Sequence, residues 1–231
     1  MPLENAGGKV QWTTTTAEEH KLIEARQLAQ TVAYTPNPQY EFKKAIKKVA
    51  IIGAGPAGLP TARHLLEEGL QVKIFERNAA SGGTWIFNED KPINPEFPSE
   101  IPTKVVKPSL PPEEVKLPFK KINDIKEVKQ ELLRLTPPTP CYRSLKNNVP
   151  TPLIKYKDFE WRKDTPWFTT HDKILEYLQD YSLHFKLEEI TEYNTSVENL
   201  TELPNQSGWN VLTKSAVFLE DDKVEIEWKE E

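Results

Sequence analysis

The sequence is poor in cysteine and has no long hydrophobic run. Its single cysteine, Cys141, excludes an internal disulfide framework and any metal site built from cysteines. No apolar run approaches the roughly 20 residues that a membrane-spanning helix requires. Residues 1–9 contain no apolar stretch followed by a cleavage site, so no signal peptide is predicted. We therefore expect a protein of the cytoplasm or of the cytoplasmic face of the endoplasmic reticulum.

Basic charge is also scarce. Lys and Arg number 30 against 35 Asp and Glu, which gives a net charge of −5, and no basic block occurs. A chain of this kind is not expected to bind nucleic acid. No acid or cysteine lies at metal-ligand spacing from any histidine, so no metal site is predicted. The histidines are His20, His64, His171 and His184.

Proline, by contrast, is abundant, with 20 residues, while hydrophobic residues make up only 37% of the chain. This composition indicates a globular part joined to long irregular stretches. We expect a polar, partly helical arm over residues 1–45, with its helix at 17–33, followed by an α/β domain over 46–231. Within that domain, a proline-rich insertion at about 88–140 is expected to be irregular except for one helix at 123–135.

A strand, a glycine turn, a helix and a second strand follow one another from Lys48. The β-branched run at 48–52 is typical of a buried parallel strand, 59–68 has helical composition, and 71–76 is again strand-like. This order predicts a βαβ unit of a Rossmann-like domain. Further along we predict an amphipathic helix at 171–185. Strands are predicted near 195–203, 209–213 and 224–228, the last two as an antiparallel pair.

The turn itself is Gly53-Ala54-Gly55-Pro56-Ala57-Gly58. A glycine at position 53 permits a sharp exit from the strand, one at 55 leaves room for phosphates, and one at 58 lets the helix pack closely. The helix N-terminus then offers free N–H groups and a partial positive charge to an anion. The turn is therefore predicted to hold the diphosphate of a dinucleotide.

An acidic residue, Glu76, ends the second predicted strand. A carboxylate there accepts hydrogen bonds from ribose hydroxyls and repels a 2′-phosphate, which favours FAD or NAD over NADP at this turn. One residue fits the pattern poorly. Pro60 falls inside the predicted helix, where proline removes a hydrogen bond, and the sequence alone gives it no function.

Just downstream of Glu76 lies Gly82-Gly83-Thr84-Trp85. Together with the glycine turn and the acid, this block resembles the N-terminal signature of the flavin-containing monooxygenases, and of fungal members in particular. The resemblance implies that FAD is the bound dinucleotide and that Gly83, Thr84 and Trp85 lie against it. It also implies a flavoprotein of the type with two dinucleotide-binding domains.

A second block, Tyr142 to Pro150, resembles the family segment L-x-x-N-x-P, and the following Tyr156-Lys157-Asp158-Phe159 resembles its Y-x-D-F. Asn147 stands where the family has threonine or serine. The resemblance implies that Asn147, Asn148 and Val149 contact the cofactor. It also implies that Asn148 is the catalytic residue, donating its amide to the oxygenated flavin or to bound NADP. The alternative is that Asn148 only caps a turn.

The resemblance further implies an enzyme in which NADPH reduces FAD and O₂ adds to form a C4a-hydroperoxyflavin. That species then oxygenates a soft nitrogen or sulfur nucleophile. Two later signatures of the family, a second G-x-G-x-x-G for NADPH and an A-T-G strand, do not occur. We therefore expect an incomplete FAD-binding domain with the NADPH domain absent, exposed apolar faces and unpaired sheet edges.

Such a chain is expected to lack turnover alone, and a complementary chain is its candidate partner. Two other readings stay open. The chain could be a flavin-binding fragment or remnant without catalysis. It could also be a simple NAD-binding Rossmann protein, which the Gly82-Gly83-Thr84-Trp85 block disfavours.

Overall fold

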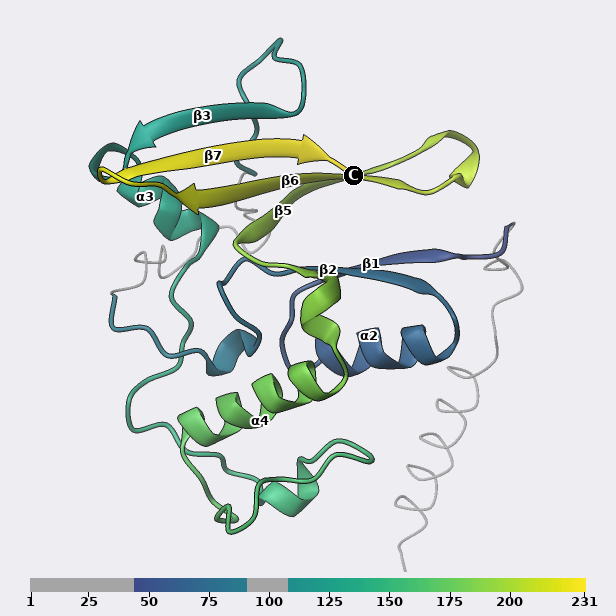
Figure 1. Cartoon of the computed structure of the whole chain (residues 1–231), viewed down its shortest axis with the longest axis vertical. Coiled ribbons are helices and arrows are strands. Elements are labelled where there is room, and N and C mark those ends of the chain that lie inside the picture. The colour runs from purple at the N-terminus through teal and green to yellow at the C-terminus, as the bar shows by residue number, and fades with distance from the viewer. Residues whose placement is uncertain (1–43, 91–107) are drawn as a thin grey trace, which may run out of the picture. The chain divides into compact units, whose positions relative to one another are not determined.

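In the computed structural model, which describes residues 44–90 and 108–231, the predicted strand, turn, helix and strand are all present (Figure 1). Strand β1 covers Lys48–Ile52, helix α2 covers Gly58–Glu67, and strand β2 covers Gln71–Phe75. The chain divides into Met1–Lys43 and Lys44–Glu231, and all the described elements belong to the second part. The helix expected at 17–33 lies outside the described residues.

The first sheet is parallel and has the strand order β1-β2-β4. Strand β4 is only Thr191–Glu192, too short for any pattern in the sequence to reveal. Helix α4, His171–His184, confirms the predicted amphipathic helix. Helix α2 packs against this sheet and α4 packs against α2, as Figure 1 shows, and all of them contribute to one hydrophobic core.

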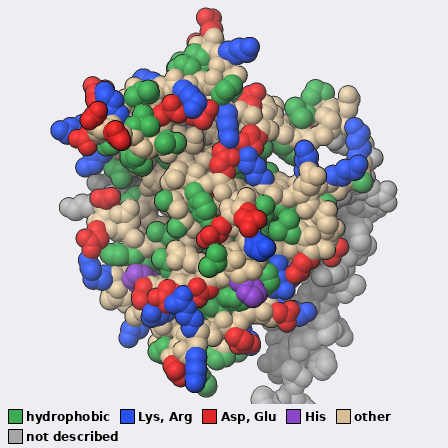
Figure 2. All heavy atoms as spheres, viewed as in Figure 1, with side chains coloured by type: hydrophobic (Ala, Val, Ile, Leu, Met, Phe, Trp, Pro, Cys, Tyr) green, Lys and Arg blue, Asp and Glu red, His purple; other side chains and the backbone are tan. Residues whose placement is uncertain are grey.

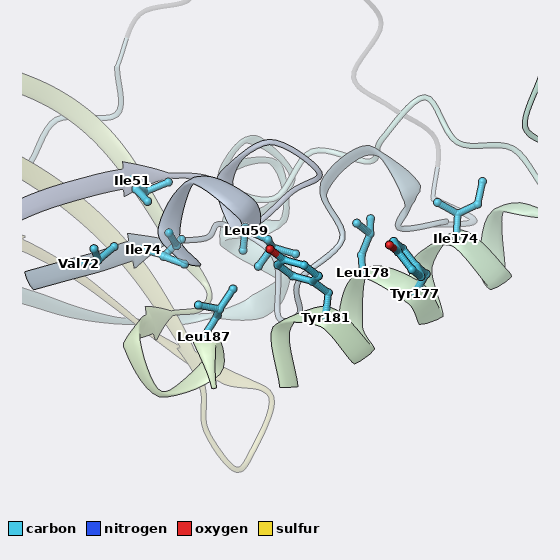
Figure 3. Packing of buried hydrophobic residues seen from close by; sticks show 11 residues of the cluster. Ile51, Leu59, Val72, Ile74, Ile174, Tyr177, Leu178, Tyr181 and Leu187 are labelled. Atoms are coloured by element: carbon cyan, nitrogen blue, oxygen red, sulfur yellow. The ribbon is translucent and has the colours of Figure 1, made fainter. Parts of the chain in front are cut away.

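A hydrophobic core joins the sheet to its two helices (Figure 3). Ile51 of β1 pairs in register with Ile74 of β2, and both side chains point toward the helices. From the other side Leu59 of α2 and Tyr181 of α4 complete the contact, and both are fully buried. Because this core lies directly beneath the glycine turn, it fixes where the turn sits relative to both strands.

The second sheet is antiparallel, with the strand order β3-β7-β6-β5. Its strands and the helix against it are β3 (Phe119–Asp124), α3 (Ile125–Leu135), β5 (Thr195–Glu202), β6 (Trp209–Phe218) and β7 (Lys223–Glu230). The predicted pairing of the last two strands is confirmed. The core between this sheet and α3 includes Val128, Leu135, Val224, Ile226 and Trp228.

Strand β3 corrects the expectation of an irregular insertion. The segment pairs over its whole length with β7, about 100 residues further along the chain. Its sequence hides this because the alternation is inverted: Ile122 is 58% exposed, whereas Asn123 is buried. The segment forms a strand because it pairs with β7, and its own sequence pattern does not predict one.

Four short 3₁₀ helices complete the described elements. They are η2 (Gly83–Trp85), η3 (Thr151–Leu153), η4 (Leu187–Ile190) and η5 (Pro204–Gln206). No helix in the described part of the chain is both long and apolar enough to cross a lipid bilayer. On the face shown in Figure 2, acidic and basic side chains are interspersed, in line with the mixed composition.

Strand β1 leaves apolar surface open. Among residues 44–90 and 108–231 it pairs only with β2, so one edge of the first sheet has no strand beside it. Ile52, on the face opposite the helices, is 59% exposed. The expected exposed face and unpaired edge are therefore found at β1, beside the glycine turn.

Candidate functional site

A cavity of about 570 Å³ opens where β1 and β2 end. Ligands of open α/β sheets bind beyond the carboxyl ends of the parallel strands, so this is the expected position for a cofactor. The cavity is lined by residues from five separate runs of the sequence. They are Ile52–Gly58 without Ala54, Phe75–Asn78 followed by Gly83 and Thr84, Pro138–Pro140, and Thr195–Val197.

The glycine turn is held against the start of α2 by direct backbone packing. A Cβ atom placed on Gly58 would lie only 1.9 Å from the carbonyl oxygen of Gly53. No side chain fits there, because such separations fall far below van der Waals contact. Gly53 is in turn tied to the second strand, since its N–H donates to the Phe75 carbonyl at 2.8 Å. The first turn of the helix therefore meets the sheet edge at a fixed position.

The glycine turn also touches the downstream glycine pair. A Cβ on Gly83, which has φ +54°, would lie 2.9 Å from the Cα of Gly55. The N–H of Gly82 donates to the carbonyl of Ala54 at 2.9 Å. Two motifs separated by a helix and a strand thus form one continuous backbone surface. The sequence predicted both motifs but not this contact between them.

The Glu76 carboxylate is 3% exposed and lies under the turn. Its Oε2 accepts a hydrogen bond from the Ala54 N–H at 2.7 Å. Its Oε1 accepts from the backbone N–H and the side-chain amide of Asn78, at 2.8 and 2.7 Å. A carboxylate offers about four acceptor positions, so one remains. The sequence predicted that Glu76 binds a ribose, and the structure adds that its carboxylate also holds the glycine turn in place.

The N-terminus of α2 is suited to an anion. Its N-cap, Ala57, makes no side-chain capping bond, and no acidic residue lies in the first turn. The first N–H groups of a helix have no partner within the helix, and they carry partial positive charge. Because Ala57 and Gly58 line the cavity, these groups border it. The residues present fit a dinucleotide diphosphate.

The other predicted site residues divide into two groups. Gly83 and Thr84 line the cavity. Trp85 follows them in η2 but packs against the core of the first sheet. Asn147, Asn148 and Val149 are not among the residues that line this cavity.

Asn147 is buried and ties two loops together. Its Oδ1 accepts a hydrogen bond from the N–H of Thr169, and its Nδ2 donates to the carbonyls of Val149 and Trp167. The side chain of Asn148 is exposed. The sequence predicted a cofactor contact for Asn147, and the structure adds that its side chain joins these two loops.

Sequence reasoning missed the cavity walls formed by Pro138–Pro140 and Thr195–Val197. The prolines sit in a stretch that reads only as irregular chain. Thr195 begins β5, three residues after the end of β4, and its N–H donates to the Glu76 carbonyl at 2.9 Å. Recognising the two-residue strand β4 would have placed Thr195 at the cavity, but two residues carry no periodic signal.

The family model described as flavin-binding monooxygenase-like matches residues 46–94 and 133–224. The match covers more than half of the chain and includes the glycine turn, Glu76 and the Gly82–Trp85 block. The chain belongs to this family. Proteins of the flavin-binding monooxygenase-like family are oxidoreductases that use FAD and NADPH. Residues 95–132, which include β3, lie outside the match.

Fungal relatives are similar over much of the chain. The flavin-containing monooxygenase ustF2 of Aspergillus flavus is 34% identical over 66% of this chain and 32% of its own length. The flavin-containing monooxygenase iboF of Amanita muscaria is 33% identical over 76% of this chain and 35% of its own length. The chain therefore spans about a third of the length of these flavin monooxygenases.

Among solved structures, the S-allyl-L-cysteine S-oxygenase of Allium sativum superposes with a TM-score of 0.51 at 26% identity. The superposition covers 80% of this chain and 35% of that protein. The α/β fold deduced from the βαβ unit is thus shared with the structure of this S-oxygenase, again over part of its length.

Proposed function

We propose that this chain supplies the FAD-binding portion of an NADPH-dependent flavin monooxygenase that oxygenates soft nitrogen or sulfur nucleophiles. One observation carries the proposal. The uncapped first turn of α2, the Gly55–Gly83 contact and the buried Glu76 carboxylate all border one cavity at the ends of parallel strands. An anion site beside an acceptor for sugar hydroxyls matches the diphosphate and ribose of FAD.

Each part of the cavity has a proposed role. The backbone of residues 53–58 takes the diphosphate, and Glu76 accepts a hydrogen bond from a ribose hydroxyl at its remaining acceptor position. Gly83 and Thr84 extend the wall that the turn forms, and Trp85 packs beneath them and keeps them in place. The negative charge of Glu76 disfavours a 2′-phosphate, so NADPH is assigned no place in this cavity.

Bound FAD, reduced by NADPH, supplies the reaction with O₂ at its C4a position and the transfer of one oxygen atom to the nucleophile. The contribution proposed for this chain is to bind and orient FAD. The amide of Asn148 is the proposed hydrogen-bond donor toward the reacting end of the flavin. The fixed position of Asn147 supports this role, because it holds the backbone on either side of Asn148.

The experiment is a titration of the purified whole chain with FAD, followed by flavin fluorescence. Glu76→Gln should weaken FAD binding by about tenfold or more, since charge-assisted hydrogen bonds contribute about 1.5–3 kcal/mol. Glu67→Gln is the matched control, because it removes the same charge from an exposed side chain of α2 and should leave the affinity unchanged.

Two further measurements separate the competing functions. A folded chain that takes up NAD but no FAD would show that the simple NAD-binding reading is right and the proposal wrong. NADPH oxidation by the chain alone is expected to be absent. It should be regained on addition of a separately produced protein that carries the remaining length of a fungal relative. Flavin binding without any regained oxidation would favour a non-catalytic flavin-binding protein.

A further inference from the structure

Proline at position 60 leaves one carbonyl of the glycine turn without its helix partner. The N–H of Leu59 donates to the carbonyl of Gly55 at 3.1 Å, and the N–H of Thr61 donates to that of Ala57 at 3.3 Å. Between these two bonds the helix pattern assigns Pro56 the N–H of Pro60. Proline has no N–H. The carbonyl of Pro56, a residue that lines the cavity, therefore needs a donor from elsewhere.

That donor is a tyrosine 100 residues away in the sequence. The hydroxyl of Tyr156 donates to the Pro56 carbonyl at 2.5 Å. Tyr156 lies between η3 and α4, in the segment that leads into the α4 side of the core. A side chain from a distant loop thus makes the hydrogen bond that the helix cannot make.

The ring of Tyr156 is held firmly enough to keep this bond. Its centroid lies 4.6 Å from that of Tyr181 and 5.7 Å from that of Tyr177. Its own N–H donates at 2.7 Å to the hydroxyl of Tyr177, which in turn donates to the Phe159 carbonyl at 2.9 Å. Burial, followed by the neighbouring tyrosines, raises the pKa of Tyr156, so its hydroxyl remains a donor throughout the physiological range.

We propose that Tyr156 is a positioning residue for the cofactor. Its hydroxyl replaces the hydrogen bond lost at Pro60 and so holds the carbonyl of Pro56 and the first turn of α2 in the shape that faces the diphosphate. The inference rests on the proposed function, because its consequence is measured as affinity for FAD. It also explains Pro60. Because proline leaves the Pro56 carbonyl without a helix hydrogen bond, that carbonyl bonds to Tyr156 and so joins α2 to the distant loop.

The test is a cycle of four whole-chain proteins: wild type, Tyr156→Phe, Pro60→Ala and the double variant. Tyr156→Phe should raise the Kd for FAD about fivefold, the fold-change of one hydrogen bond. Alanine at position 60 restores the N–H, so in the Pro60→Ala background the same change should alter the Kd less than twofold. The effect of losing the Tyr156 hydroxyl should thus depend on which residue stands at position 60.

Tyr181→Phe is the control within the same aromatic cluster. Its buried hydroxyl has no hydrogen-bond partner in the described part of the chain, so its removal should change the Kd for FAD equally in the two backgrounds. The proposal is wrong if Tyr156→Phe binds FAD as tightly as the wild type. It is equally wrong if the loss is the same with proline and with alanine at position 60.

Thermal unfolding of the four proteins without FAD separates this inference from the proposed function. Tyr156→Phe should lower the Tm more with proline than with alanine at position 60, whether or not FAD binds. A wild-type chain that shows this coupling but takes up no FAD would sink the proposed function and leave the hydrogen-bond replacement standing. A chain that binds FAD with no coupling in either measurement would sink the replacement alone.

Discussion

The two sheets of this protein are assembled by different means, although both bury an apolar face against helices. The two longer strands of the parallel sheet come from a short local sequence, in which β1, the glycine turn, α2 and β2 follow one another within about 30 residues, and the two-residue β4 is the distant strand. The antiparallel sheet depends on distant pairing, since β3 is about 100 residues from its partner β7. The first sheet carries the glycine turn and Glu76, and the second sheet adds part of the wall of the same cavity.

The second sheet reaches the cavity through β5. Its first residue, Thr195, donates from its N–H to the carbonyl of Glu76, and Thr195–Val197 form part of the cavity wall. A strand that belongs to one sheet thus completes the site that the other sheet begins. Substitutions in each sheet should therefore separate the effects on binding from those on stability.

The largest effect of a substitution is expected at Gly58, where the packing of the helix on the first sheet leaves no space for a side chain. Gly58→Ala places a Cβ 1.9 Å from the Gly53 carbonyl, so either the turn or the helix must move. We expect FAD affinity to fall more than 100-fold and unfolding free energy to fall by about 3 kcal/mol, the upper range for overpacking. Flavin titration and urea unfolding measure the two effects.

Gly69→Ala is the matched control, at the other end of the same helix. No atom lies within 4 Å of the added Cβ, but φ is +79°. Only backbone strain of about 1–2 kcal/mol is expected, with the FAD affinity unchanged. If Gly58→Ala binds FAD normally, the close backbone packing is not what shapes the site.

Truncation of a core side chain in the second sheet should lower the stability and leave the FAD affinity nearly unchanged. Ile226 is 1% exposed, and Ile226→Ala should lower the unfolding free energy by about 3 kcal/mol. Because Ile226 lies outside the cavity, the Kd for FAD should change less than threefold at temperatures where the variant is folded. Ile74→Ala, equally buried in the first sheet, should lower both quantities. Equal loss of affinity in the two variants would erase the distinction between the sheets.

The same division governs what the sequence alone could predict. Residues 53–58 and Glu76 are readable because diphosphate binding restricts both their type and their spacing. The hydrogen bonds of Glu76 to Ala54 and Asn78 are not readable, since they exist only when turn and strand end are brought together. The readable part of the site is the part that faces the ligand.

Elements fixed by long-range pairing were missed for a different reason. In β3 the buried residue is Asn123 and the exposed one is Ile122, so its alternation predicts the wrong face. Pro60 stands out in the sequence as an exception, but Tyr156, which bonds to the Pro56 carbonyl in its place, lies on a loop that no local pattern connects to the helix. The residues that break a local sequence rule are thus the ones whose environment is set by contacts with distant parts of the chain.

A smaller effect is expected at the buried lysine of the second sheet. Lys214 is 1% exposed, and its Nζ donates to Ser109 Oγ at 2.7 Å and to Glu131 Oε1 at 2.5 Å. Lys214→Met keeps the apolar stem but removes these bonds. Because the Glu131 side chain is 34% exposed and can turn to water, we expect a loss of only about 1 kcal/mol in urea unfolding.

Lys223→Met is the surface control, since its pair with Asp124 at 3.2 Å is exposed. That variant should change the unfolding free energy by no more than about 0.5 kcal/mol. A loss above about 3 kcal/mol in Lys214→Met would instead mean that Glu131 stays trapped without a partner, as in a fully buried ion pair.

The smallest effect concerns the charges that join the two sheets. Lys229 of β7 contacts Glu192 of β4 and Glu231, each at 2.7 Å, and Lys73 of β2 contacts the same two carboxylates. Burial alone would raise the pKa of Glu231, but hydrogen bonds from Lys229 and Lys73 lower it below its ordinary 4.5. The folded state therefore binds fewer protons at this group than the unfolded state does.

A carboxyl group with a lowered pKa stabilises the fold above its unfolded value, and this contribution is lost as the pH falls through the folded value. In unfolding curves, Glu231→Gln should be less stable than the wild type by about 0.5 kcal/mol at pH 7, since the side chains are partly exposed. The difference should shrink as the pH falls below about 4.5, because the carboxyl group then becomes protonated first in the unfolded chain and, at lower pH, in the folded protein. A difference that persists unchanged at pH 3 would mean that the two sheets are joined there by packing and not by charge.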